Sequence, residues 1–341
     1  MARRPIAVPL VDPYARRVTD LRISITDRCN FRCSYCMPEE GMQWLDRAEL
    51  LSYEELARIA RVCVERFGFE AIRITGGEPL VRAHVVRLVE LLAPLGVDLA
   101  MTTNGVKLPE VAHDLARAGL DRVNISLDSL RRATFLALTR RDELDRVLAG
   151  IDAALDAGLT PVKINAVVMR GINDDEVVDL AAFARAKGLG MRFIEFMPLD
   201  ADDAWSHDKV VPAREILDRI HAVFPLRSDP VPGSGHTQPA ERFEYADGLG
   251  DVGVIASVTE PFCDSCDRVR ITAEGKFRTC LFAIEEFDLR SVLRPSADGA
   301  ADLDERLATE IARAVGTKWA GHRIGQVDFV RPERSMSQIG G

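Results

Sequence analysis

Two groups of three cysteines are the residues of this sequence best suited to chemistry. The first group has the spacing C-x3-C-x2-C and the second the spacing C-x2-C-x13-C: Cys29, Cys33 and Cys36, then Cys263, Cys266 and Cys280. With seven cysteines in 341 residues, one given three-cysteine spacing would arise by chance in about 0.003 of chains. Both triads are therefore candidate metal-binding sites.

Three thiolates favour an iron–sulfur cluster over zinc. A closed zinc site uses four nitrogen or sulfur ligands, and neither triad has a fourth cysteine or a histidine at zinc-finger spacing. A four-iron cluster held by three cysteines leaves one iron open for a ligand that is not protein. For the first triad the spacing favours iron–sulfur, whereas for the second triad zinc with a bound water remains an equal alternative.

The triads must be positioned by regular elements, and strands alternate with helices over the first two-thirds of the chain. Six strands are expected from Leu21, Ala71, Val97, Arg122, Val162 and Met191. Helices are expected near 54–67, 82–93, 108–117, 143–157 and 175–187. Capping boxes are predicted at Ser52–Glu55 and Asn173–Glu176, and Cys63 is predicted on the core face of the first helix. This alternation indicates βαβ units and a parallel sheet.

The strands carry apolar side chains on one face and polar side chains on the other. The polar faces hold Arg22/Ser24/Thr26, Arg73/Thr75, Asp98/Thr102/Asn104, Asn124/Ser126/Asp128 and Lys163/Asn165. Helices can cover the apolar faces, so the polar faces must surround a shared interior. We expect an α/β fold, a partial (β/α)6 barrel. The sixth strand is ambiguous, because Arg192 and Glu195 fall on opposite faces.

Three cations fall on the polar faces: Arg22, Arg73 and Lys163. An unpaired buried charge costs several kcal/mol, against a total stability of about 5–15 kcal/mol. We therefore expect an anionic ligand inside the barrel. Internal pairing with Asp98 or Asp128 is the alternative.

The last third of the chain changes character after a Pro/Gly/Ser-rich stretch at 228–240, which indicates a linker. We expect a barrel domain at 1–235 and an α+β region at 236–341, with a strand near 252–258, the second triad and an amphipathic helix. That helix would bury Leu303, Leu307, Ile311 and Val315. For the terminal Gly340–Gly341, composition favours a frayed end over a thin probe of a narrow space.

Composition limits the class of protein. Apolar residues make up 47% and charged residues 28%, which excludes disorder and disulfide-rich scaffolds. The net charge of −9 argues against general binding to nucleic acid or to a membrane surface. The N-terminus lacks the apolar core of a signal peptide, so we expect a cytoplasmic enzyme.

A glycine-rich motif at the second strand completes the pattern. The first triad directly follows the strand from Leu21, and the strand from Ala71 runs into Gly76-Gly77-Glu78-Pro79. Paired glycines let the backbone approach a ligand, and Glu78 can accept from an ammonium group. Alone, GGEP is explained equally well by a tight turn. Together with the three-cysteine loop, which holds Tyr35 before its last cysteine, it resembles the radical S-adenosylmethionine (SAM) enzymes.

Within that superfamily, residues 16–341 resemble the GTP 3′,8-cyclase family of molybdenum cofactor biosynthesis. The second triad, TTNG, SLD, RFIEFMP and the terminal Gly-Gly carry this resemblance. It implies a radical SAM barrel, a [4Fe–4S] cluster on each triad and no catalytic side chain beyond the ligands of cofactor and substrate. The implied SAM-binding residues are Tyr35, Gly77, Ser126 and Met197. The implied GTP-binding residues are Arg22, Arg73, Thr102, Lys163, Arg268 and Arg270, and the tail residues Gly340 and Gly341 would reach the site.

The resemblance also implies a reaction and partners. Such a lyase cleaves SAM to a 5′-deoxyadenosyl radical, which takes the C3′ hydrogen of GTP. The ribose carbon then attacks C8 of guanine to give 3′,8-cyclo-7,8-dihydro-GTP. A flavodoxin- or ferredoxin-type electron donor and a downstream cyclic pyranopterin monophosphate synthase are implied, and a homodimer is compatible.

Two alternatives remain open. One is a radical SAM peptide-modifying enzyme with an auxiliary cluster, although such C-terminal regions generally carry more than three cysteines. The other is a non-catalytic iron–sulfur or zinc protein, either an electron carrier or an interaction module, which would bind no SAM.

Overall fold

A computed structural model describes residues 7–200, 202–227, 239–294 and 302–340. In this part of the chain, one sheet has the strand order β11-β10-β9-β1-β2-β3-β4-β5-β6-β8-β7. Its central six strands are parallel neighbours: β1 Asp20–Ser24, β2 Ala71–Thr75, β3 Asp98–Thr103, β4 Arg122–Ser126, β5 Lys163–Val168 and β6 Gly190–Glu195. The six strands predicted in the first two-thirds of the chain are confirmed, and β8 Asp251–Ile255 confirms the strand predicted near 252–258.

The sheet continues beyond these six strands on both sides. β9 (Arg268–Ile271) is parallel to β1, and β8 (Asp251–Ile255) is parallel to β6. The edges are antiparallel: β10 Lys276–Arg278, β11 Phe287–Asp288 and β7 Glu241–Glu244. The curved sheet is therefore a partial barrel to which the C-terminal region adds strands. The expected linker at 228–240 lies mostly outside the described residues, and the division at 235 stays a prediction.

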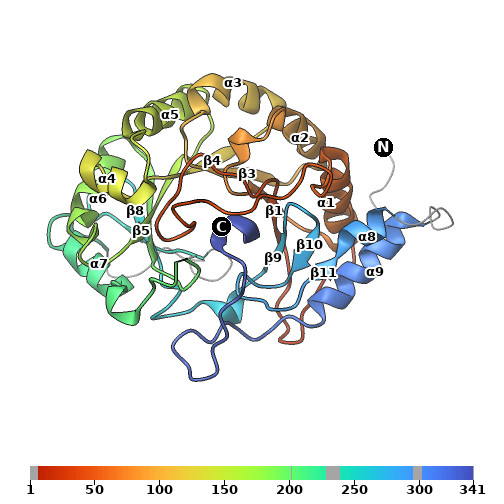
Figure 1. The fold of residues 1–341 in the computed structure, drawn as a ribbon. Helices are drawn as coiled ribbons and strands as arrows, with labels where there is room; N and C mark the ends of the chain where they lie inside the picture. The colour runs from red at the N-terminus through yellow and green to blue at the C-terminus, as the bar shows by residue number, and fades with distance from the viewer. Residues whose placement is uncertain (1–6, 201, 228–238, 295–301, 341) are drawn as a thin grey trace.

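Helices surround the sheet on its outer side (Figure 1). Six were predicted: α1 Tyr53–Phe67, α2 Val85–Leu92, α3 Leu108–Ala118, α5 Leu144–Asp156, α6 Val177–Ala186 and α9 Leu303–Val315. The others are α4 Arg132–Thr139, α7 Ala213–His221, α8 Leu289–Leu293 and α10 Met336–Ile339. Short 3-10 turns occupy Pro79–Val81, Ala93–Leu95, Asp174–Glu176, His207–Lys209 and Cys263–Ser265. No helix among the described residues is long and apolar enough to cross a membrane.

One of the two predicted capping boxes is present. Ser52 Oγ accepts from Glu55 N at 3.1 Å, and Ser52 N donates to Glu55 Oε2 at 2.7 Å. The prediction at Asn173 is wrong. Its amide donates instead to the carbonyls of Asp128 and Val167, at 2.8 and 2.9 Å. Because the Asn173 amide donates to these two carbonyls, it joins the ends of two strands and does not cap a helix.

The predicted alternation of strand faces is confirmed. Ile23, Ile74, Met101, Ile125 and Ile164 are fully buried beneath the helices. Cys63 is likewise fully buried on the core face of α1. The polar faces of the same strands line the interior, so the sequence pattern correctly distinguished a barrel from a flat sheet with both faces covered.

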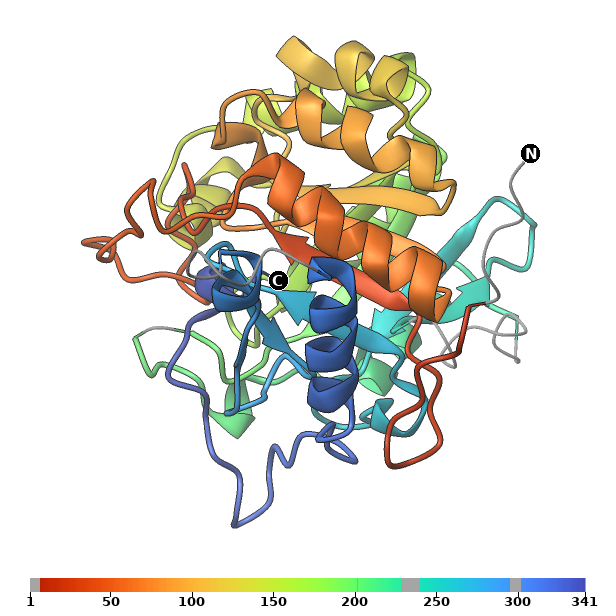
Figure 2. The ribbon, with the colours of Figure 1, turned by 90° about the vertical axis from the view of Figure 1, so that its right-hand side faces the viewer.

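The C-terminal region packs against the barrel at two places. Helix α9 lies beside α1 (Figure 2), where Arg58 Nε donates to Asp304 Oδ1 at 2.6 Å. The predicted core positions Leu307, Ile311 and Val315 are fully buried, whereas the predicted Leu303 is only half-buried at the start of the helix. The chain then returns to the barrel, and α10 lies at its centre in Figure 1. Gly340 is buried there, so the frayed-end expectation is wrong for this residue, while Gly341 lies outside the described residues.

Candidate active site

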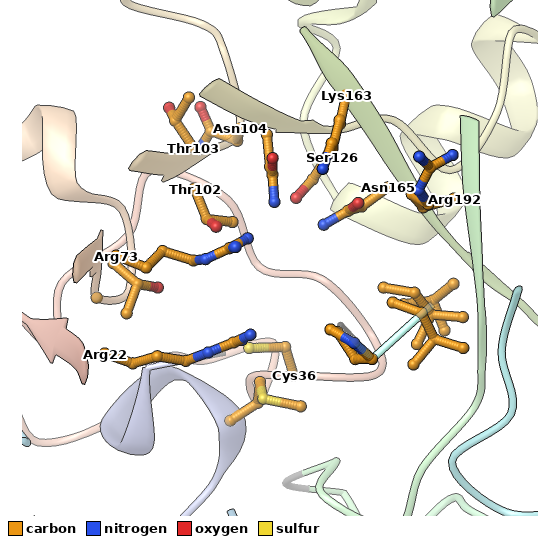
Figure 3. Close-up of a pocket in the computed structure, with 18 of the residues that line it drawn as sticks. Arg22, Cys36, Arg73, Thr102, Thr103, Asn104, Ser126, Lys163, Asn165 and Arg192 are labelled. Atoms are coloured by element: carbon orange, nitrogen blue, oxygen red, sulfur yellow. The ribbon is translucent and has the colours of Figure 1, made fainter. Parts of the chain in front are cut away.

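A cavity of about 560 Å³ occupies the inside of the barrel (Figure 3). All six central strands contribute to its wall, and the loops after β1 and β2 close one side. Cavities of about 300–1,000 Å³ hold small-molecule ligands and cofactors. The interior is thus large enough for a ligand to contact both the strands and the first cysteine loop.

The first triad lies on the loop after β1, and all three of its cysteines line the cavity. Helix α4, which the sequence pattern missed, braces this loop. Arg32 N donates to Thr139 O at 3.0 Å, and Ser34 N donates to Leu138 O at 2.9 Å. Burial raises the pKa of Cys29 and of Cys36 to about 12. Because burial disfavours the thiolate form, the thiolates need a positively charged partner such as iron.

Tyr35 is fixed by Asp128 at the end of β4. Its hydroxyl donates to Asp128 Oδ2 at 2.6 Å, and Val167 N donates to Asp128 Oδ1 at 2.8 Å. Burial raises the pKa of Asp128 to about 6. The bond from Tyr35 therefore satisfies a carboxylate that would otherwise be costly to bury, and it anchors the cysteine loop to the sheet.

Gly77 is required by close packing. A Cβ there would lie 2.5 Å from the backbone oxygens of both Asp27 and Arg28, which no side chain can tolerate. The backbone of the GGEP motif therefore packs directly against the cysteine loop at the end of β2. Next to it, Glu78 is buried and accepts from Thr103 Oγ1 and Asn104 N, each at 2.7 Å. Burial raises the pKa of Glu78 to about 7, so a cation in the cavity would favour its charged form.

The second triad lies in the C-terminal region. Arg268 Nη2 donates to Cys266 Sγ, and Phe282 N donates to Cys280 Sγ, each at 3.4 Å. Burial alone would raise the pKa of Cys266, but the Arg268 and Lys318 cations outweigh burial and lower it to about 7. A Cβ on Gly321 would lie 2.5 Å from Cys263 Cβ, so backbone closes tightly around this triad.

Each triad supplies three cysteines and no further ligand at zinc-finger spacing. Among the described residues, no three Cys, His, Asp or Glu side chains are gathered closely enough to hold one metal ion. With Zn–S bonds of about 2.3 Å, tetrahedral zinc would bring its sulfur ligands to roughly 4 Å from one another. A cluster holds its cysteines further apart, because each binds a different iron. Three cysteines are one ligand short of a closed zinc site and are the number that holds a four-iron cluster with one iron open.

The opposite part of the cavity wall is cationic. Arg22, Arg73, Lys163 and Arg192 point into it in Figure 3, and Arg270 also lines it. Burial and the neighbouring cations lower the pKa of Arg73 to about 9 and that of Lys163 to about 7. Burial is the larger cause and the crowding of positive charge the second, and an anion in the cavity would offset both.

Internal pairing with Asp98 or Asp128 does not neutralise these cations. Asp98 pairs with Arg122, and Asp128 accepts from Tyr35. Arg22 lies 3.8 Å from Asp20 Oδ2, and the buried Nε of Arg73 has no hydrogen-bond partner in the described structure. The predicted pairing with Asp98 or Asp128 is therefore wrong. Arg192 is neutralised by Asp251 at 2.8 Å, which leaves Arg22, Arg73 and Lys163 to face a ligand.

The structure brings most of the expected site residues to this one cavity. Tyr35, Gly77, Thr102, Ser126 and Met197 line it together with the cations. Arg268 is not in the cavity wall but lies beside the second triad. It is two residues before Arg270 on β9, whose register pairs Arg270 with Arg22 of β1. Arg270 Nη1 donates to Gly340 O, which brings the C-terminal tail to the same wall.

Comparison with known proteins gives the family. The chain matches the models "Radical SAM superfamily" over residues 23–184 and "Molybdenum Cofactor Synthesis C" over residues 189–324. It is 49% identical to GTP 3′,8-cyclase of Streptomyces coelicolor over 342 residues, covering 100% of this chain and 98% of the relative. The cyclase of Paenarthrobacter nicotinovorans is also 49% identical, with 100% and 99% covered. The chain belongs to the GTP 3′,8-cyclase family.

Solved structures agree with the fold. Streptococcus suis SuiB bound to S-adenosylmethionine matches with a TM-score of 0.58 at 12% identity, over 87% of this chain and 69% of that chain. At this identity the likeness shows the radical SAM fold alone. The family membership and the shared barrel together establish a radical SAM enzyme that uses SAM and iron–sulfur clusters.

In this member of the GTP 3′,8-cyclase family, several residues of the site had no role predicted from the sequence. The face of the strand on which Arg192 lies was ambiguous. Parity places Arg122 and Asp98 on the polar face, but their ion pair was not predicted. Asn124 and Asn165 were placed on that face without a role. Lys318, beside the second triad, follows α9 in a loop with no periodic pattern, so the sequence offered no signal for it.

Proposed function

We propose that this chain converts GTP to 3′,8-cyclo-7,8-dihydro-GTP, the first step of molybdenum cofactor biosynthesis. One observation carries the proposal: a cysteine triad shares a single cavity with a group of cations, of which Arg73 and Lys163 form no ion pair with the described residues. The cysteines suit a cluster, and the cations suit a polyanion such as a triphosphate. The names of the close relatives support this substrate.

At the first triad, Cys29, Cys33 and Cys36 would hold the [4Fe–4S] cluster, and Tyr35, Gly77, Ser126 and Met197 would bind SAM. When bound, these groups supply the one-electron cleavage of SAM that yields a hydrogen-abstracting radical. The protein fixes their place through the α4 brace and the Tyr35–Asp128 bond, and it keeps the loop against β2 through Gly77. A rigid loop matters because a misplaced radical reacts with the wrong hydrogen.

At the cationic wall, Arg22, Arg73, Lys163 and Arg270 would bind the phosphates of GTP, with Thr102 beside them. Arg268 would act at the boundary with the second triad, where Cys263, Cys266 and Cys280 would hold the second [4Fe–4S] cluster facing the guanine. The strands fix both groups of residues. The ribose would then be held between the two ends of the cavity, close to the SAM-derived radical that abstracts its hydrogen.

The C-terminal tail would complete the enclosure. Gly340 has a φ of 82°, and a Cβ there would lie 2.8 Å from Ser24 Cβ. Only glycine fits this left-handed backbone against the strand. We include Gly340 and Gly341 among the residues that exclude water from the site.

The proposal extends to partners and location. An electron donor of the flavodoxin or ferredoxin type would reduce the first cluster, and a cyclic pyranopterin monophosphate synthase would take the product. We place the protein in the cytoplasm, where GTP is available, with a homodimer compatible with the fold.

The test is anaerobic. The purified protein is analysed for iron and sulfide, then incubated with dithionite, SAM and GTP while 5′-deoxyadenosine and cyclised nucleotide are followed. We expect about eight irons per chain, as for two four-iron clusters, and a GTP-dependent nucleotide product. SAM cleavage without a GTP product would move the substrate to the peptide-modifying class. Zinc in place of iron, without SAM cleavage, would overturn the proposal.

A further inference from the structure

The segment at residues 317–322, which follows α9, lies against the second cysteine triad. Gly321 contacts Cys263 so closely that a Cβ would lie 2.5 Å from Cys263 Cβ and 2.8 Å from its Sγ. Lys318 is the charged residue of this segment, and it is only 3% exposed. A buried ammonium group is costly unless acceptors surround it, so its partners indicate its purpose.

Those partners join the separate parts of the triad. Lys318 Nζ donates to Arg268 O at 2.5 Å, to Thr279 O at 2.9 Å and to Cys266 Sγ at 3.9 Å. Thr279 directly precedes Cys280, and Arg268 lies two residues after Cys266. One ammonium group therefore connects the Cys263–Cys266 turn to the strand end that carries Cys280. Among the described residues it forms no ion pair with a carboxylate, so its charge is not cancelled locally.

Arg16 holds the segment in place from the other side. Its Nη1 donates to the carbonyls of Cys263 and Ala320, each at 2.6 Å, and its Nη2 donates to Trp319 O. Its own charge is paired, because Nε donates to Asp12 Oδ2 at 2.6 Å. The two cations thus differ: Arg16 is neutralised and structural, whereas Lys318 presents its charge to a sulfur.

We propose that Lys318 is a positioning residue for the second cluster, which sets the relative place of Cys266 and Cys280 and supplies a fixed positive charge to the Cys266 ligand. This inference rests on the proposed function, which assigns a cluster to the triad. Groups beside a ligand tune both the stability and the potential of a metal centre. Reduction adds negative charge to a cluster, so a neighbouring cation favours the reduced form.

The test isolates the second cluster. In a background of Cys29→Ser, Cys33→Ser and Cys36→Ser, only the second triad can hold iron. There, Lys318→Met keeps the length of the side chain and removes its charge. Lys187→Met is the matched control, because Lys187 is exposed and pairs with Asp152. Iron content and the midpoint potential, from an anaerobic titration followed by electron paramagnetic resonance, are the two readouts.

We expect Lys318→Met to lower the equilibrium constant for reduction of the cluster about tenfold. For a one-electron couple this moves the midpoint potential about 59 mV in the negative direction. The Lys187→Met control should not move it. A purely structural lysine would change iron content without moving the potential of the clusters that form. Full iron content with an unchanged potential would overturn the proposal.

If Lys318→Met retains too little iron for a titration, Lys318→Arg decides. Arginine keeps a cation and donors for the same carbonyls, so recovery of iron would support the proposal. Loss of iron in Lys318→Arg, with the far-ultraviolet circular dichroism of the parent, would overturn it. Neither readout needs GTP turnover. Failure of the cyclase assay with normal iron and a shifted potential would therefore count against the proposed function alone.

Discussion

Replacing Lys163 by methionine should stabilise the ligand-free protein while it damages the use of GTP. The Lys163 ammonium faces the cavity among Arg73, Arg122, Arg192 and Arg242, and the described residues form no hydrogen bond or ion pair with it. Burial, followed by these cations, lowers its pKa from 10.5 to about 7. A charge that the fold disfavours in this way is a functional group held at a cost in stability.

The size of the effect follows from the pKa difference. At 1.36 kcal/mol per pKa unit, the shift has an upper bound of about 5 kcal/mol at and below pH 7. Solvent in the cavity screens the charge, so we expect a gain of about 1–3 kcal/mol for Lys163→Met. An unfolding entropy of about 2.1 cal/mol/K per residue gives roughly 0.7 kcal/mol/K for this chain, so the Tm should rise by about 1–4 °C.

The pH dependence of the stability gain shows whether the charge on Lys163 causes it. Between pH 7 and 10.5 the unfolded chain holds a proton at Lys163 that the folded chain has released, so the stability of the wild type rises with pH in this window. The advantage of the variant should therefore be largest near pH 7 and disappear near pH 10.5. Pyrophosphate, a simple polyanion, should raise the Tm of the wild type more than that of the variant.

The assay is thermal unfolding of the reduced, cluster-free protein, followed by circular dichroism in chloride buffers from pH 6.5 to 10. Lys187→Met serves as the control, because an exposed lysine contributes less than about 0.5 kcal/mol. A Lys163→Met variant that is less stable than the wild type at pH 7 would refute the reasoning. So would a gain that is the same at pH 7 and pH 10.

Three further outcomes are expected. Cys29→Ser should abolish both SAM cleavage and the GTP product and leave about four irons per chain; retained SAM cleavage, measured as 5′-deoxyadenosine, would contradict the first-cluster assignment. Gly77→Ala should lose SAM binding in equilibrium dialysis, since its Cβ would lie 2.5 Å from two carbonyl oxygens of the cysteine loop, and wild-type affinity would show that the loop can move freely. Tyr35→Phe should lower the free energy of unfolding in urea by about 1–3 kcal/mol, because it leaves Asp128 Oδ2 buried without its 2.6 Å donor. An unchanged urea midpoint would mean that water replaces the hydroxyl.

Local residue patterns were enough to predict the barrel, the cations inside it and the start of α1. The alternation of polar and apolar residues predicted the barrel, since a strand must present successive side chains to opposite faces. The same parity predicted that Arg22, Arg73 and Lys163 share one interior. Ser52 and Glu55 marked the start of α1 because their bonds are made within one turn.

Bonds between distant parts of the chain could not be read in this way. Asn173 has the sequence pattern of a cap, yet its amide is used by the ends of β4 and β5. Lys318 gave no local signal, and its role depends on carbonyls about 40 and 50 residues away.

The C-terminal tail also shows the difference between what the sequence predicts and what the tertiary structure decides. Gly340 looks like a frayed end by composition, but the fold buries it against Ser24 and gives its carbonyl to Arg270. The sequence determined the six central strands, most of the helices around them and the chemistry of the cysteines, because these depend on residue type and short spacing. Only the tertiary structure decided which cations are left unpaired and which distant groups serve each triad, because that depends on which backbone and side-chain partners the completed fold brings within reach.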